Sequence, residues 1–221
     1  MTRHFAYFSA LVMLAAAASA QAAPIVFTAN LTHAQEPSGL TPLTTSTGGA
    51  RPLSFGSGTF VLNDAMTALT MSVNVFNIDV TGTQTPDPND NLVAAHIHAN
   101  ATITGGDPTL TAPVVWGFFG TPFNDNNPND FVLTPFATGV GGTFTGKWDA
   151  PEGNGTTLTA QLPNILGGHS YINFHTVQFG GGEIRGFLIA QVPEPGSLAL
   201  MGIGLAGLGF RRRYWSVGGK I

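Results

Sequence analysis

Two histidines separated by one residue stand inside the apolar run LVAAHIHAN at 92–100, in a chain that has only six histidines. On a β-strand, residues i and i+2 point to the same face, so His96 and His98 project together while Ala95 and Ile97 face the other way. We expect the apolar residues to face the core, which places both imidazoles on the outer face with side-chain origins about 7 Å apart. Two imidazoles at that separation can close onto one copper or zinc ion.

A second candidate strand carries the same pattern in GHSYINFHTV at 168–177. Ile172 and Phe174 alternate there with His175, and His169 falls on the same outward phase as His175. His175 is therefore the expected third metal ligand, and His169 is a supporting residue. Three imidazoles leave an open coordination position for water or another ligand.

The segment GGGEIRGFLIAQ at 180–191 adds two charges on one strand face, since Glu183 and Arg185 alternate with Ile184. If the three strands are neighbours, Glu183 and Arg185 join the histidines in one polar patch outside the barrel. The alternative is that the outward histidines are only solvated, and that Glu183 and Arg185 pair with neighbouring charges or strand carbonyls.

The elements that must position these residues are short strands. Period-two alternation between Gly, Pro, Asn and Asp clusters predicts nine of them, at 25–33, 57–63, 68–78, 92–99, 113–119, 142–148, 156–162, 170–177 and 183–190. With 29 glycines and 15 prolines to supply turns and no helical period between the chain ends, this pattern predicts an all-β fold, a single β-sandwich or closed barrel.

Two features of this region have alternative explanations. The Asp/Asn-rich loops 79–91 and 120–130 could supply oxygen ligands to calcium, but neither has the EF-hand spacing, and Asx turns are favoured. Trp116 with Phe118 and Phe119 could form a carbohydrate platform, but packing in the core or at an edge is favoured.

Both chain ends have the composition of targeting segments. Residues 1–22 combine a basic start, an apolar middle and small residues around Ala20, which predicts a helical secretory signal peptide. The chain has no cysteine, so the exported domain at 24–190 must be stable without disulfides. Residues 191–215 contain a Pro-Glu-Pro break, an apolar run at 198–210 and three arginines, which predicts a short transmembrane helix with the domain outside.

The charge of the expected mature domain narrows its partners. Residues 24–190 hold three basic and eleven acidic side chains, a net charge of −8. Phosphate binding requires basic side chains, so neither nucleic acid nor an anionic lipid surface is an expected partner. The negative charge suits cations.

The C-terminal residues VPEP, a short glycine-containing apolar helix and RRR resemble the PEP-CTERM sorting signal of exopolysaccharide-producing Gram-negative bacteria. The residues that carry this resemblance are Pro193, Glu194, Pro195, Arg211, Arg212 and Arg213. The resemblance implies processing by an exosortase-type protease near Pro193 to Pro195. It also implies transient anchoring in the inner membrane, followed by a place in the periplasm, at the cell surface or in the extracellular matrix.

The motifs QEPSG at 35–39, AAHIHAN at 94–100, YINFHT at 171–176 and GGEIRGFL at 181–188 occur in an order and at distances that resemble the CHRD domain of secreted proteins. A more distant likeness is to copper-zinc superoxide dismutase, which implies a Greek-key barrel. In that likeness His96, His98 and His175 match the copper ligands, and Arg185 matches an active-site arginine. The bridging histidine, the zinc cluster and the disulfide have no counterpart in this sequence, so a zinc-supported dismutase is not expected.

Two functions follow from these residues. The first is an exported, non-catalytic binding or structural module that takes a metal ion, an exopolysaccharide or a cell-surface protein. The second is a small copper-dependent oxidoreductase in which Arg185 guides an anion. No further general base or nucleophile is recognisable in the sequence, so the binding module is favoured.

Overall fold

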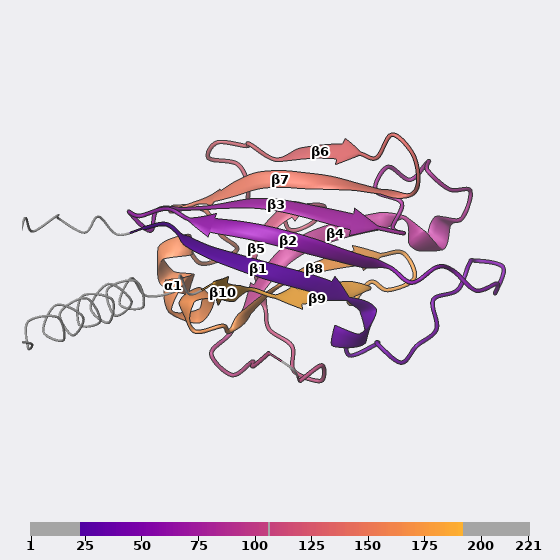
Figure 1. Ribbon diagram of the computed structural model, residues 1–221, viewed down its shortest axis with the longest axis horizontal. Coiled ribbons are helices and arrows are strands. Elements are labelled where there is room, and N and C mark those ends of the chain that lie inside the picture. The colour runs from indigo at the N-terminus through magenta and orange to yellow at the C-terminus, as the bar shows by residue number, and fades with distance from the viewer. Residues whose placement is uncertain (1–22, 106, 192–221) are drawn as a thin grey trace, which may run out of the picture.

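The computed structural model describes residues 23–105 and 107–191, and these residues form one curled antiparallel sheet (Figure 1). The predicted signal helix at 1–22 and the sorting segment from 192 onward, with its Pro-Glu-Pro and arginine residues, lie outside the described residues. Within the described part, no helix is long and apolar enough to cross a membrane.

The sheet has ten strands in the order β5-β4-β8-β9-β1-β2-β3-β7-β6, with β10 paired to β1. The strands are β1 (Ile25–Thr32), β2 (Phe55–Leu62), β3 (Ala68–Phe76), β4 (Leu92–Ala99), β5 (Val114–Phe119), β6 (Val132–Pro135), β7 (Gly141–Asp149), β8 (Ser170–Thr176), β9 (Ile184–Phe187) and β10 (Ile189–Gln191). Two 3-10 turns, η1 (His33–Gln35) and η2 (Pro88–Asp90), and one helix, α1 (Leu158–Leu166), complete the fold. The predicted all-β class is confirmed.

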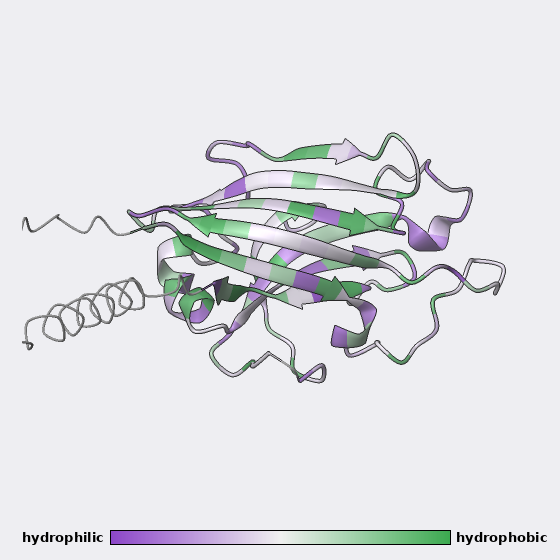
Figure 2. Cartoon of the chain, viewed as in Figure 1, coloured by the Kyte–Doolittle hydropathy of each residue, from purple (hydrophilic) through white to green (hydrophobic). Residues whose placement is uncertain are grey.

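The core lies between the two halves of the curled sheet. Phe27 of β1 and Phe144 of β7 belong to the same buried cluster as Ile97 of β4 and Phe174 of β8. Each of these side chains is fully buried, as period-two alternation requires when one face of each strand meets the core. Figure 2 shows the resulting alternation of green and pale or purple residues along the strands.

The structure differs from the predicted elements at three places. The predicted strand at 156–162 is absent, because residues 158–162 lie in helix α1. The Thr157 side chain caps this helix by accepting a hydrogen bond from the Ala160 amide at 3.2 Å. The four-residue edge strand β6 was not predicted, because its residues VLTP are few and do not alternate between apolar and polar. Predicted strand 183–190 is divided into β9 and β10, which pair with different neighbours.

The three residues weighed as a sugar platform pack in the core or against it, and Phe119 is the one that is only partly buried. Trp116 and Phe118 of β5 are fully buried in the core cluster, and Trp116 stacks on Trp148 with ring centroids 5.7 Å apart. Core packing, the favoured alternative, is confirmed.

Candidate metal centre

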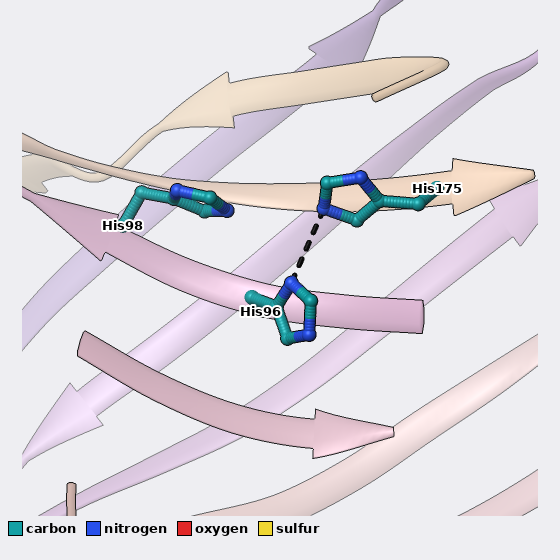
Figure 3. Close-up of side chains that lie close together, drawn as sticks. All are labelled: His96, His98 and His175. Carbon is teal, nitrogen blue, oxygen red and sulfur yellow. Dashed lines mark hydrogen bonds between the residues drawn. The ribbon is translucent and has the colours of Figure 1, made fainter. Parts of the chain in front are cut away.

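Strand pairing brings the three predicted imidazoles together. In the β4–β8 ladder His96 lies opposite Asn173, and His175 lies opposite Ala94, so His96 and His175 are diagonal neighbours on one face. Long side chains reach each other across such a diagonal. Figure 3 shows the His96 and His175 rings pointing toward each other, with His98 further along β4. One ring nitrogen from each of the three histidines lies within 4.8 Å of the others.

The histidines lie on the side of the sheet that the alternation predicts, opposite the core residues Ala95 and Ile97. That face is not open to solvent, however. His96, His98 and His175 are only 4%, 8% and 7% exposed, because loops cover them. The outer patch is therefore a buried layer between the sheet and its loops.

Three loops cover the cluster, and each contributes one backbone carbonyl. The second ring nitrogen of each histidine contacts one of them: His96 Nε2 lies 3.1 Å from Thr121 O, His98 Nδ1 lies 2.8 Å from Ala112 O, and His175 Nδ1 lies 3.0 Å from Gly180 O. Carbonyl oxygens only accept hydrogen bonds, so each of these ring nitrogens carries the proton. The remaining nitrogens, His96 Nδ1, His98 Nε2 and His175 Nε2, are left with free lone pairs.

The three nitrogens that carry these lone pairs lie close together, and no proton forms a hydrogen bond between them. His96 Nδ1 and His175 Nε2 are 3.2 Å apart, and His98 Nε2 is buried without a hydrogen-bond partner. Burial lowers the pKa of His96 and of His98 to about 4, and it also lowers that of His175. Because the rings are neutral, His96 Nδ1 and His175 Nε2 are two hydrogen-bond acceptors in contact. A cation bound between them would stabilise this contact.

A glycine in β5 makes the cover over His96 possible. A β-carbon added at Gly117 would lie 1.9 Å from Pro122 O and 3.1 Å from a carbon of the His96 ring. Only glycine lets the 121–122 segment approach the strand closely enough for Thr121 to accept the His96 hydrogen bond. No pattern in the sequence indicates this role for Gly117.

Arg185 is near the cluster but its donors are occupied. The guanidinium lies over the Tyr171 ring at 4.6 Å, and Tyr171 in turn stacks on His98 with centroids 4.9 Å apart. Arg185 donates hydrogen bonds to four backbone carbonyls, those of Gln35, Asp107, Pro108 and Leu110. It therefore ties η1 and the 107–110 loop to β9, and it does not present a free guanidinium to an anion.

The other two supporting residues lie apart from the histidines. Glu183 is buried in a separate group, where it pairs with Arg51 at 2.8 Å and accepts hydrogen bonds from Ser54 and Thr176. His169 Nδ1 donates a hydrogen bond to Ile103 O at 2.6 Å, and His169 is not in the histidine cluster. The structure thus does not join Glu183 or His169 to the metal centre.

A buried carboxyl group beside Asn173 was not among the predicted site residues. Glu36 is 2% exposed, and its Oε1 has no hydrogen-bond partner. A β-carbon at Gly182 would lie 2.7 Å from Glu36 Oε2 and 2.6 Å from the Asn173 amide nitrogen, so the two side chains lie side by side. Burial raises the pKa of Glu36 to about 8, against a lowering by Arg185.

Residues 23–105 and 107–191 contain no second group of three or more His, Cys, Asp or Glu side chains close enough to share a metal ion. In the 79–91 loop, Asp79 instead accepts hydrogen bonds from the amides of Thr81, Gly82 and Thr85. This is the Asx-turn geometry that was favoured over calcium.

Comparison with known proteins agrees with this architecture. A family model of the CHRD domain matches residues 27–188, which include every strand from β2 to β9 and all three clustered histidines. The chain belongs to the CHRD domain family. A second family model, the PEP-CTERM protein-sorting motif, matches residues 191–213. No curated protein and no solved structure matches the chain.

The two matches together indicate that this CHRD protein is exported and sorted. The PEP-CTERM motif is a sorting signal recognised by exosortase, so the protein is exported and sorted to the cell envelope of a Gram-negative bacterium. The CHRD domain, at 27–188, precedes the sorting signal, at 191–213, in the chain.

Proposed function

We propose that this CHRD domain is an exported binding module that holds one zinc or copper ion through His96, His98 and His175. The observation that carries the proposal is the set of three carbonyl contacts, which fix the ring tautomers and direct three free lone pairs toward one another. Metal-binding histidines commonly donate their second N–H to a carbonyl in this way.

The donor set fits these metals. Neutral imidazole nitrogen suits zinc and copper, and three such ligands leave one position for water or a partner group. The 3.2 Å between His96 Nδ1 and His175 Nε2 is close to the roughly 3.3 Å that separates two nitrogens on a tetrahedral zinc ion. His98 Nε2, buried without a partner, supplies the third donor.

A binding role is supported over the copper oxidoreductase alternative by the state of Arg185. An anion guide needs accessible N–H groups, whereas the Arg185 side chain is fully buried and donates four hydrogen bonds to backbone carbonyls. The same three histidines would hold copper in either case. The proposed partners during sorting are an exosortase-type protease and the inner membrane, and the mature protein acts at the cell surface or in the matrix.

Metal titration of the purified full-length protein in mild detergent tests this function. After treatment with EDTA and dialysis, we expect calorimetry and elemental analysis to give one zinc or copper ion per chain. The His96→Ala/His98→Ala double variant should lose at least about 100-fold in affinity, since two of three ligands are gone.

His169→Ala is the matched control, because His169 is a histidine outside the cluster and should leave the stoichiometry at one. Circular dichroism would establish that each variant is folded. Full-length protein that binds neither metal, or a double variant that binds as well as the parent, would refute the proposal. Superoxide or ascorbate turnover by the copper form, lost in the double variant, would favour the oxidoreductase instead.

A further inference from the structure

The outward face of the other half of the sheet carries rows of uncharged hydroxyl and amide side chains. In strands β1, β2, β3, β7 and β6 the paired outward residues form two rows that run across the strands. One row is Asn30, Ser57, Asn74, Thr143 and Thr134, and the next is Thr28, Thr59, Ser72 and Thr145, which ends at the exposed apolar residue Val132 of β6. Most of these side chains are exposed. In Figure 2 the middle parts of β2 and β7 are near white, as hydroxyl residues and glycine require.

An aromatic row borders these hydroxyl and amide rows. Phe55 of β2 stacks on Phe76 of β3 with ring centroids 4.8 Å apart and planes 11° from parallel, and Phe136 packs on Phe76 at 4.9 Å. Phe55 is 48% exposed, and none of the three belongs to a core cluster. Phe76 and Phe136 also line an open groove of about 390 Å³.

This combination is unusual for a surface that only meets water. A solvated strand face needs no aromatic side chains, and half-exposed phenyl rings in contact with each other mark a binding surface. The rows beside them offer hydroxyl and amide groups, which both donate and accept hydrogen bonds. One of these bonds, Thr143 Oγ1 to Asn74 Oδ1 at 2.7 Å, already links neighbouring strands.

We propose that this face binds a neutral polysaccharide chain, with sugar rings stacked on Phe55, Phe76 and Phe136 and sugar hydroxyls bonded to the two polar rows. A sugar ring has apolar C–H faces and hydroxyl groups around its edge. The protein face offers phenyl rings for the C–H faces and, beside them, hydroxyl and amide groups for the sugar hydroxyls. The neighbouring strands are about 4.8 Å apart, so the rows present hydroxyl and amide groups at the spacing of a single sugar ring.

The charge of the face and of the domain argues against polyanionic polymers as the ligand. Neither row contains a charged side chain, and Lys147 at its border is paired with Asp130 and Asp149. The net charge of −8 over residues 24–190 repels polyanions. A protein partner would need a larger apolar centre than one row of rings.

This site is separate from the proposed metal centre. The rows lie on strands β1, β2, β3, β7 and β6, while the histidines lie on β4 and β8 and face outward on the opposite side of the core. Binding of the polymer should therefore not depend on metal, and either proposal can fail without the other.

Affinity electrophoresis of the full-length protein in mild detergent tests the inference. Native gels would contain dextran, galactomannan, hydroxyethyl cellulose or, as a polyanion, alginate. We expect at least one neutral polymer to retard the protein, in the presence or absence of EDTA, and alginate not to do so. The Phe55→Ala/Phe136→Ala double variant should lose about tenfold or more in apparent affinity, because two stacking rings are removed.

Two further variants guard against a folding artefact. Ser72→Glu places a charge in the middle of the face at an exposed position and should also abolish retardation, whereas Leu40→Ala changes an apolar residue that is 100% exposed elsewhere and should not. Retardation by none of the neutral polymers, retardation by alginate alone, or unchanged retardation of both face variants would overturn the proposal.

Discussion

Replacing Arg185 by methionine is expected to lower the free energy of unfolding by about 4 kcal/mol, a large part of the stability of a single domain. The guanidinium is fully buried, stacks on Tyr171 and Phe187, and donates hydrogen bonds to carbonyl groups of two separate segments, η1 and the 107–110 loop. Methionine keeps most of the volume but leaves these carbonyls buried without donors, which is the costly part of the change.

Urea denaturation of the full-length protein in detergent, followed by tryptophan fluorescence, measures this effect. Lys147→Met is the matched control, because Lys147 forms only partly exposed ion pairs, with Asp130 and Asp149, and should change stability by less than about 1 kcal/mol. If the two variants lost similar small amounts, Arg185 would not be the tie between η1, the 107–110 loop and β9 that its contacts indicate.

Glu36 should make the metal-free protein less stable as the pH rises from 4.5 to 8. Burial raises its pKa in the folded state from 4.5 to about 8, so the folded protein holds a proton that the unfolded chain releases across this range. Stability from this group is present below pH 4.5 and is lost as the pH approaches 8. By pH 7 the loss amounts to about 3 kcal/mol at 1.36 kcal/mol per unit of pKa.

The histidines give the opposite slope at lower pH. Burial lowers the pKa of His96 from 6.5 to about 4, so below pH 6.5 the unfolded chain takes up protons that the folded protein does not. Their contribution is present above pH 6.5 and is lost as the pH falls toward 4. Three histidines outweigh one carboxyl group below pH 6.5, so the metal-free protein should be most stable at about pH 6.5 to 7.

Urea midpoints measured from pH 5 to pH 8 in EDTA test both slopes. Glu36→Gln should remove the decline above about pH 7, because the amide imitates the protonated carboxyl group. Asp64→Asn, a change at an exposed carboxylate, should leave that decline in place. A decline of the same size in Glu36→Gln would show that Glu36 is ionised in the folded protein.

Most of the strands were predicted from the alternation of apolar and polar residues. It places β4 at 92–99 and gives the face of His96 and His98 correctly, because a buried core fixes the phase of each strand that crosses it. It fails at 158–166, where a threonine cap and a short amphipathic segment give a similar pattern to a strand over a few residues.

The environment of the histidines could not be predicted in the same way. Burial of His96, His98 and His175 depends on loops whose paths the alternation does not encode, and on Gly117, whose role appears only when Pro122 lies against it. Glu183 shares the outward phase of Arg185 but lies just before β9, where its side chain turns to Arg51 instead. The sequence shows the phase of a strand residue, whereas its partners depend on the tertiary fold.

X-ray absorption at the metal edge of the zinc-loaded full-length protein tests the central claim most directly, since it reports the ligands themselves. The account predicts a first shell with three imidazole nitrogens at about 2.0–2.1 Å, reduced to one imidazole in the His96→Ala/His98→Ala variant. A first shell of oxygen atoms, or a spectrum that the double variant leaves unchanged, would contradict it.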